Sequence, residues 1–304
     1  ELNKKNIIIP PNEQKHKIPY PGGYVKEPYV GSHDWVVSFD LNSLYPNLIV
    51  QYNMSPETIT EAQAPNGVVG YLESDPVPRN FREQNIAIAA NGSTYDKSQQ
   101  GILPQIIVDY YAERSEVKKQ MLAKEREYQK EKTFHLEKEI NQLENQQMAI
   151  KILLNSLYGA LGNKHFRYFD MRMAEGITLS GQLSIMWAEK AMNKEMNRIL
   201  KTENRDYVIA MDTDSLYINM GPLVKQLNPK DPVAALDKIC SEHFEKVLEK
   251  SYAELFDKQQ AYTNRMVMAR EVIANRGIWT AKKRYILNVH NSEGVQYAEP
   301  KLKI

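Results

Sequence analysis

Three aspartates in two short segments have the residue types and spacing of a divalent-cation site. Asp212 and Asp214 flank Thr213 between two short β-type runs, so a hairpin is expected to present them at its turn. Asp40 ends a separate apolar run over 35–39. Carboxylates packed closely repel one another, and Mg²⁺ relieves that repulsion because it prefers oxygen ligands. Each piece taken alone is more typical of ordinary turn chemistry, so the prediction depends on their coming together.

A second set of residues follows the spacing of one helical face. Lys151, Asn155 and Tyr158 are separated by four and three residues, which places them on the same side of a helix. A cation and an amide there can hold a triphosphate, and an aromatic ring can stack against a base pair. The alternative is an exposed lysine beside a packed tyrosine. Asn155 is a poor helix former, and Gly159 is expected to break the helix soon after it, which favours a functional reason for both.

Arg114 and Lys118 form a further pair of cations, four residues apart on a long helical stretch. If that stretch pairs with the one that carries Lys151, the three cations converge on an anion. In isolation the same pair is an ordinary charged helix face.

The last part of the chain has a local excess of positive charge. Residues 264–304 contain eight Lys or Arg and three acids, a difference of +5 in a chain whose formal net charge is +1. The run Lys282-Lys283-Arg284-Tyr285 combines cations with an aromatic ring, as surfaces that follow a phosphate backbone do. A solvated strand edge is the alternative for this run.

These residues need a mixed set of elements to position them. Long stretches without Gly or Pro predict two helices joined near residues 133–135, plausibly as an antiparallel hairpin. The expected elements are an irregular lead-in (10–34), a strand (35–39), loops with some short strands (55–101), the two paired helices (105–133 and 136–158), a third helix (171–200), the aspartate hairpin (207–218), further helix (232–260), and strands with turns (265–298).

Composition excludes several classes of protein. The 304 residues are 42% hydrophobic and 25% charged, which is globular rather than disordered composition, and no apolar run is long enough to span a membrane. The single cysteine, Cys240, excludes an internal disulfide and a cysteine-cluster zinc site. No P-loop, dinucleotide-binding fingerprint, zinc-type histidine spacing or serine–histidine pair occurs. The chain begins at Glu1 without an initiator methionine or secretory signal, so we expect a piece of something longer.

Taken in order, the segments resemble the conserved motifs of family B DNA polymerases. The three polymerase motifs are matched by Asp40-Leu41-Asn42-Ser43-Leu44-Tyr45-Pro46, by Lys151-Ile152-Leu153-Leu154-Asn155-Ser156-Leu157-Tyr158-Gly159, and by Asp212-Thr213-Asp214-Ser215. Tyr20-Pro21-Gly22-Gly23 is similar to the family's Y-x-G-G linker, and Lys282-Lys283-Arg284-Tyr285 to its K-K-R-Y element. The surrounding sequence is most similar to the replicative polymerases of T-even-like bacteriophages, and the resemblance covers nearly the whole chain.

The resemblance implies an α+β fold. A palm, built as an antiparallel sheet backed by helices, would occupy residues 1–93 and 164–304. A two-helix fingers hairpin would be inserted over 94–163.

The resemblance also implies roles for individual residues. Asp40, Asp212 and Asp214 would be the catalytic carboxylates, with two Mg²⁺ ions (Mn²⁺ substituting) held by Asp40, Asp214 and the Leu41 carbonyl. Tyr45 would be the steric gate that excludes a ribose 2′-hydroxyl, which disfavours an RNA polymerase or a reverse transcriptase. The deoxynucleoside triphosphate would contact Ser43, Leu44, Tyr45, Arg114, Lys118, Lys151, Asn155 and Tyr158. Tyr158 and Gly159 would pack against the nascent base pair, and Lys282, Lys283, Arg284 and Tyr285 would bind DNA.

The implied activity is DNA-directed DNA synthesis on a primer–template, with a possible sliding clamp as partner, no membrane, and the cytoplasm of an infected bacterium as location. Family members carry an exonuclease before the linker and a thumb after the palm, and we expect both to be absent here. Asn47 stands where serine is usual, outside the implied contacts. The alternative function is a subunit of a split polymerase, inactive until it assembles with the missing parts. A purely helical scaffold is the third possibility, but it leaves the three aspartates unexplained.

Overall fold

An antiparallel sheet of six strands is the centre of the structure, a computed structural model that describes residues 18–304. The first 17 residues, including the start of the expected lead-in and of the first palm segment, lie outside the described residues. The strand order is β5 (Val208–Asp212), β6 (Ser215–Asn219), β1 (Gly31–Leu41), β7 (Met268–Ala281), β8 (Arg284–Ser292) and β9 (Val295–Lys303). The chain enters at β1 in the middle and adds neighbours on both sides, so segments far apart in sequence meet in this sheet.

Strand β1 is longer than its apolar run predicts. It begins at Gly31, where the backbone pairs with Trp279 of β7, whereas the sequence predicted an irregular lead-in to residue 34. The prediction was wrong for 31–34 because the outer half of the strand is only partly buried. Ser32 and Asp34 are exposed, so polar residues occur there without disturbing the pairing.

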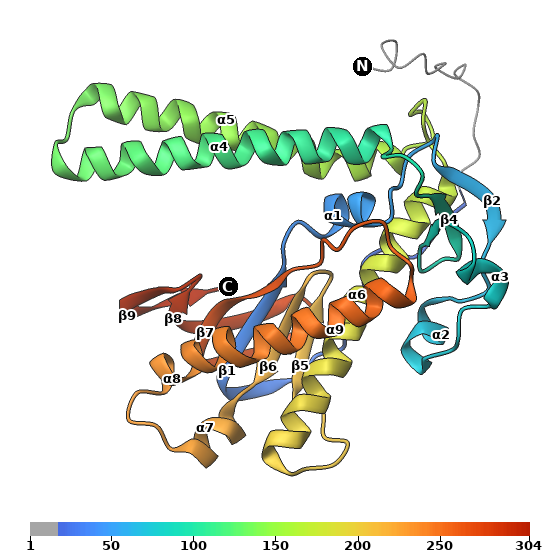
Figure 1. Cartoon of the computed structure of the whole chain (residues 1–304). Coiled ribbons are helices and arrows are strands. Elements are labelled where there is room, and N and C mark those ends of the chain that lie inside the picture. Colours follow the sequence, from blue (N-terminus) through green and yellow to red (C-terminus); the bar gives the residue numbers. More distant parts are fainter. Residues whose placement is uncertain (1–17) are drawn as a thin grey trace.

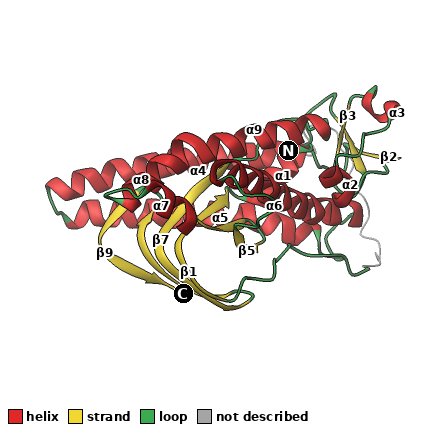
Figure 2. Ribbon diagram, turned by 90° about the horizontal axis from the view of Figure 1, so that it is seen from below, coloured by secondary structure: helices red, strands yellow, loops and turns green. Residues whose placement is uncertain are grey.

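Two helices cover one face of the sheet, α6 (Met171–Leu200) and α9 (Glu245–Lys258), as Figure 2 shows. The side chain of Asp170 caps α6 by accepting a hydrogen bond from the backbone N–H of Arg172 at 2.9 Å. Before α9 come α7 (Gly221–Leu227), α8 (Pro232–Ile239) and a π-helical turn (Cys240–Phe244). The helices predicted over 171–200 and 232–260 are confirmed.

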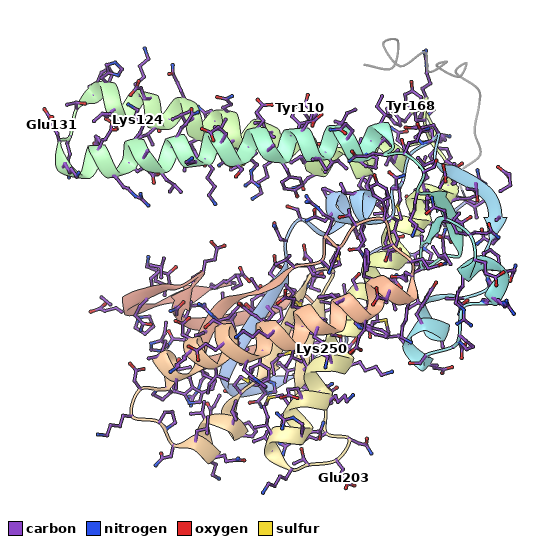
Figure 3. The ribbon with its side chains drawn as sticks, in the orientation of Figure 1. Tyr110, Lys124, Glu131, Tyr168, Glu203 and Lys250 are labelled. Carbon is purple, nitrogen blue, oxygen red and sulfur yellow. The ribbon has the colours of Figure 1, made fainter. Side chains whose placement is uncertain are left out.

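A long helical hairpin projects beside the sheet, formed by α4 (Ile102–Lys130) and α5 (Phe134–Leu161) (Figure 1). Lys124 and Glu131 lie near its free end and Tyr110 nearer its base (Figure 3). The short helix α1 (Leu44–Gln51) packs against α4, α5 and α6, between the hairpin and the sheet. The two predicted helices are confirmed, but Gly159 does not break α5, which continues to Leu161. A glycine near a helix end costs only about 1 kcal/mol, which packing of the helix readily offsets.

The predicted loop-rich region contains a smaller sheet, in the order β2 (Ile59–Gln63), β4 (Ser93–Asp96) and β3 (Ile86–Ile88), with the short helices α2 (Val68–Glu73) and α3 (Arg79–Arg82). The fold is therefore α+β, as predicted. The division into palm and fingers segments at 93 and 163 stays a prediction. Within residues 18–304, no helix is both long and apolar enough to span a membrane.

Candidate active site

A cleft of about 470 Å³ opens where the base of the helical hairpin meets the ends of the central strands. It is lined by the end of β1, the start of α1, the β5–β6 turn, both long helices and the β8–β9 turn. The lining residues are Asp40, Leu41, Asn42, Ser43, Leu44, Tyr45, Pro46, Arg114, Lys151, Asn155, Thr213, Asp214 and Glu293. Most of the side chains singled out from the sequence thus meet in one place.

Asp40 and Asp214 meet because β1 and β6 are neighbours in the sheet. Asp40 pairs in register with Ser215, whose Oγ donates a hydrogen bond to Asp40 Oδ1 at 2.8 Å. The backbone N–H of Leu41 donates to the carbonyl of Asp214 at 3.0 Å. The β5–β6 turn is therefore fastened to the end of β1, and the two carboxylates face the same cleft.

Both carboxylates have a raised pKa, chiefly because they are buried. Burial, followed by the negative charge of Asp40, raises the pKa of Asp214 to about 6. Burial also raises the pKa of Asp40, while the hydrogen bond from Ser215 opposes that shift and the charge of Glu271 adds to it. Such repulsion between like charges is the electrostatic condition that a bound cation relieves.

The turn that carries Asp214 has an unusual backbone. Thr213 has φ of 58°, in the left-handed region that a β-branched residue rarely adopts. The linker holds this turn from outside the cleft, because the Thr213 N–H donates to the Tyr24 carbonyl at 2.8 Å and Val25 forms a bridge with Asp212. A Cβ built on Gly23 would lie 2.7 Å from Thr213 Oγ1. Glycine is thus required where the linker crosses the turn.

We expect Gly23→Ala to lower the free energy of unfolding by about 1 kcal/mol and to slow any reaction that needs Asp214, because the added methyl displaces Thr213. Gly22→Ala is the matched control, since no atom lies within 4 Å of the Cβ position at Gly22. Urea titrations of both variants measure the difference. Equal losses would show that the linker needs glycine for its own backbone and not for Thr213.

An ion-pair network anchors the same linker to the helical layer. The Lys26 Nζ lies 2.5 Å from Glu189 on α6 and 2.5 Å from Asp206 ahead of β5, and it donates to the Val208 carbonyl at 2.7 Å. These pairs raise the pKa of Lys26 against the opposing effect of burial. No local pattern singles out Lys26, because a lysine shortly after a Gly-Gly turn carries no signal of partners more than 160 residues away.

Cations and an amide form the opposite wall of the cleft. Arg114 comes from α4, and Lys151 and Asn155 come from α5. Arg114 Nε donates to Gln147 Oε1 at 3.2 Å, which orients its guanidinium. Lys118 is exposed one turn further along α4 and is not among the residues that line the cleft. The hairpin therefore brings two of the three expected cations to the cleft.

An aromatic pair lies beside the cleft, where Tyr45 lines it and neither Tyr158 nor Gly159 is among the lining residues. The rings of Tyr45 and Tyr158 have centroids 4.5 Å apart. Behind Tyr45 lies Gly181 of α6, where a Cβ would approach the Tyr45 ring to 3.2 Å. Burial raises the pKa of both tyrosines, and Tyr158 also hydrogen-bonds Tyr20 of the linker. Gly181 was not predicted as a site residue. The signal that could have indicated it is a glycine inside a helix, since such a glycine often marks a close approach by another group.

The first turn of α1 supplies backbone donors beside the carboxylates. Ser43 precedes the helix with φ of 45°, and the first helical hydrogen bond runs from Asn47 N–H to the Ser43 carbonyl at 3.1 Å. The N–H groups of Leu44 and Tyr45 therefore have no partner within the helix. Asn47 turns away from the cleft, where its side chain donates to the Asn42 carbonyl and accepts from Arg265 Nε.

Asp212 and the cationic run lie behind the turn rather than in the cleft. Lys283 Nζ lies 2.8 Å from Asp212 Oδ1, and Lys282 pairs with Glu27 at 3.2 Å. Tyr285 accepts a hydrogen bond from the Tyr217 hydroxyl, and Arg284 is exposed. The structure therefore gives this run protein partners at the β7–β8 turn, next to the β5–β6 turn.

Glu293 is a cleft residue that the sequence analysis missed. It lies in the β8–β9 turn with φ of 48°, and its N–H donates to the Glu271 carbonyl at 2.7 Å. Glu271 itself is paired with Lys303 at 2.6 Å and accepts from Ser38 Oγ. Glu293 is thus a third acidic residue in the lining of the cleft, beside Asp40 and Asp214.

The cleft offers few oxygen atoms that could bind a metal ion, but they are of the kind that Mg²⁺ prefers. Among residues 18–304, no group of three or more His, Cys, Asp or Glu side chains is arranged to hold a metal ion. Asp40 and Asp214 both face the cleft, and the Leu41 backbone lies beside them. Two carboxylates and a carbonyl fit Mg²⁺, which commonly keeps few protein ligands and takes the remainder from phosphate and water.

Comparison of the whole sequence with known proteins finds one family and several relatives. A model of DNA polymerase family B matches residues 1–296. The DNA-directed DNA polymerase of Escherichia phage RB69 is 32% identical over an alignment of 358 positions. The alignment covers 100% of this chain and 39% of that protein. The enzyme of the same name from Enterobacteria phage T4 is also 32% identical, with 100% and 40% covered. DNA polymerase 1 of Pyrococcus abyssi is 28% identical over 90% of this chain and 28% of its own length. The chain thus spans about two fifths of the length of its phage relatives.

Proposed function

The chain belongs to DNA polymerase family B, and from that premise we propose that its cleft adds deoxynucleotides to the 3′-hydroxyl of a primer on a DNA template. One observation carries the proposal: two carboxylates share a cleft with two cations and an amide. These residues are Asp40, Asp214, Arg114, Lys151 and Asn155. Carboxylates on one wall and cations on the other are what a metal-bound triphosphate requires. Because the relatives are phage proteins, we infer that the chain acts in an infected bacterial cell.

We propose that Asp40, Asp214 and the Leu41 carbonyl hold Mg²⁺, and that one or two such ions are bound during the reaction. When bound, the metal supplies activation of the primer hydroxyl and charge stabilisation at the leaving pyrophosphate. The Ser215 hydrogen bond fixes the Asp40 carboxylate, and the β5–β6 turn fixes Asp214. Asp212, paired with Lys283, acts from behind the turn as a positioning residue.

The cationic wall would bind the triphosphate. Arg114 and Lys151 offer charged donors to its oxygens, and Asn155 offers an amide. The free N–H groups of Leu44 and Tyr45 lie on the other side of the cleft, next to Ser43. Lys118 is one turn too far along α4 to share this role when the hairpin stands as it does here.

Tyr45 would set the preference for deoxyribose. Its ring packs against Tyr158 and lies next to Gly181, and these neighbours would hold it against a sugar that carries a 2′-hydroxyl. Tyr158, together with Gly159 beyond it, would then present a flat surface to the nascent base pair. Lys282, Lys283, Arg284 and Tyr285 would approach the primer–template duplex from the β7–β8 turn.

Primer extension tests the proposal. The full chain is mixed at low salt with a primer–template, one complementary deoxynucleoside triphosphate, and Mg²⁺ or Mn²⁺, and the extended primer is resolved on a gel. We expect extension by one nucleotide that stops when the triphosphate does not match the template. Extension without regard to the template would contradict the proposed function.

A chain that binds the triphosphate and metal but does not extend the primer would favour the alternative function, a subunit that requires further polymerase parts. The phage relatives are longer than this chain, so the missing function could be supplied by further polymerase parts. This outcome would therefore direct the search to a partner chain. Binding of neither triphosphate nor metal would overturn both functions.

A further inference from the structure

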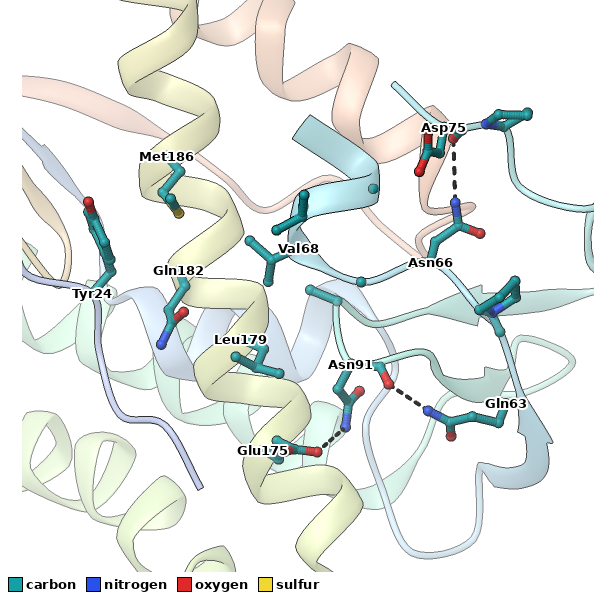
Figure 4. Close-up of a pocket in the computed structure, with 17 residues that line it drawn as sticks. Tyr24, Gln63, Asn66, Val68, Asp75, Asn91, Glu175, Leu179, Gln182 and Met186 are labelled. Carbon is teal, nitrogen blue, oxygen red and sulfur yellow. Dashed lines mark hydrogen bonds between the residues drawn. The ribbon is translucent and has the colours of Figure 1, made fainter. Parts of the chain in front are cut away.

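A hollow of about 940 Å³ crosses helix α6, and it shares no lining residue with the active-site cleft. Figure 4 shows its two carboxylates, Asp75 and Glu175, at opposite ends of that hollow. The charged groups of its described lining therefore do not converge on one point. Polar contacts converge instead behind the first turn of α1. They meet at Asn47, which is 4% exposed and directly follows the cleft residue Pro46.

Asn47 joins the loop before α1 to the segment before β7. Its Nδ2 donates to the Asn42 carbonyl at 2.6 Å, and its Oδ1 accepts from Arg265 Nε at 3.3 Å. Because Arg265 can only donate, it fixes the oxygen of the amide toward itself and the nitrogen toward Asn42. The Arg265 backbone N–H donates to Oε1 of Gln51, the last residue of α1, at 3.1 Å. One buried side chain thus ties the loop to a distant segment that is itself held to α1.

These contacts set the direction of the peptide groups on either side of Asn42. The described peptide bonds are all trans, so the C=O and N–H of one peptide group point to opposite sides. The Asn42 N–H donates to the Val267 carbonyl at 3.1 Å, which turns the Leu41 carbonyl the other way. In the same manner, the bond from Asn47 to the Asn42 carbonyl turns the Ser43 N–H away from Asn47. Asn47 lies behind the loop and Ser43 lines the cleft, so this N–H is directed into the cleft.

Three successive backbone N–H groups are without a hydrogen-bond partner at this place in the described part of the chain. Those of Leu44 and Tyr45 belong to the first turn of α1, and the third is that of Ser43. Ser43 has φ of 45° and ψ of 58°, in the left-handed region, and helical residues follow it directly. A left-handed residue next to right-handed ones makes successive N–H groups converge, a geometry that binds anions. The cations Arg114 and Lys151 line the same cleft.

We propose that Asn47 is a positioning residue for the incoming triphosphate, because it turns the Ser43 N–H into the cleft. This inference rests on the proposed function. Asn47 acts through the Asn42 carbonyl, and Arg265 keeps its amide oriented. The carboxylates proposed to hold the metal are fixed separately, by the β5–β6 turn and by Ser215. Loss of Asn47 should therefore weaken binding of the phosphate groups and leave kcat nearly unchanged.

The triphosphate affinity of the full chain tests this inference. It is measured by calorimetric titration with a deoxynucleoside triphosphate in Mg²⁺, without DNA. Asn47→Leu keeps the size and neutrality of the side chain but removes its donor. We expect it to weaken triphosphate binding about tenfold, and to raise KM in primer extension equally with kcat within about threefold. Arg265→Lys keeps the positive charge but lacks the Nε donor, and should weaken binding about threefold.

Asn197→Leu is the matched control. Asn197 Nδ2 also donates to backbone carbonyls, those of Asn193 at 2.8 Å and Arg205 at 2.7 Å. Asn197 lies near the C-terminal end of α6 and does not line the cleft. We expect this variant to have a lower free energy of unfolding, measured by urea titration, and an unchanged triphosphate affinity. A general loss of stability is thereby separated from loss of the phosphate contact.

The inference is overturned when Asn47→Leu binds the triphosphate as tightly as the wild type does. Equal losses of affinity in Asn47→Leu and Asn197→Leu would also overturn it, as would a fall in kcat at unchanged affinity. A wild-type chain that binds no triphosphate would overturn the proposed function as well, so the two failures are distinguishable. Because binding is the deciding readout, a chain that binds triphosphate without extending a primer still tests the inference.

Discussion

Asp214→Asn is expected to reduce the primer-extension rate by at least about 1,000-fold while making the folded protein more stable. Activity falls because Asp214 is one of two carboxylates that face both the cleft and the proposed metal. Stability rises because burial and the charge of Asp40 make an ionised Asp214 unfavourable in the folded state. Loss of function with a gain of stability is the signature of a residue retained for chemistry.

The pH dependence gives the sign of the stability effect. The folded-state pKa of Asp214 is about 6, above its ordinary value of 3.8, so the folded protein holds this proton more tightly than the unfolded chain does. The contribution of Asp214 to stability is favourable in acid and is lost as the pH rises through about 6. At about pH 7.5 the asparagine variant should therefore be more stable by about 1 kcal/mol, after allowance for solvent screening of a half-buried group.

Primer extension and urea titrations at about pH 7.5 and pH 4 measure the two effects. Most of the gain in stability should disappear at the lower pH, where the wild-type carboxyl is protonated in the folded state and partly protonated in the unfolded chain. Asp34→Asn is the control, since Asp34 is an exposed partner of Arg276 far from the cleft and should change neither quantity. A variant that lost activity and stability together would indicate that Asp214 mainly maintains the turn.

Lys151→Ala is expected to lower kcat/KM for the incoming deoxynucleotide about 100-fold, because it removes a charged donor from the wall that faces Asp40 and Asp214. Lys118→Ala removes the same charge from the same hairpin at a position outside the cleft. We expect its effect to stay within about threefold, as for an exposed surface cation. Single-nucleotide incorporation over a range of triphosphate concentrations gives both values.

Equal losses in the two variants would contradict the placement of the triphosphate. They would mean either that the hairpin attracts the nucleotide through its overall charge or that it moves by about one helical turn when substrate binds. Repeating the titrations at higher salt separates these explanations, because a diffuse charge effect is screened and a direct contact is screened much less.

Local sequence patterns were enough to predict several elements. The absence of glycine and proline after Pro104 predicted α4 and α5, and the β-type runs on either side of Asp212 and Asp214 predicted the hairpin that presents them. These features depend on residues a few positions apart, where backbone propensity and side-chain spacing decide the structure. The spacing of Lys151 and Asn155 likewise placed both on the face that lines the cleft.

Other features depend on neighbours that are distant in sequence. Gly23 against Thr213, Gly181 behind Tyr45, and Lys26 between Glu189 and Asp206 each join segments more than 130 residues apart.

The sequence by itself determined which residue types are available for the proposed chemistry and which helices and turns present them, because residue type and short-range spacing encode both. Only the tertiary structure decided that Lys118 stands outside the cleft and that Glu293 lines it. It also decided that Asp212 is paired with Lys283. Those outcomes follow from sheet order and helix packing, which bring together side chains whose separation along the chain carries no information about their distance in space.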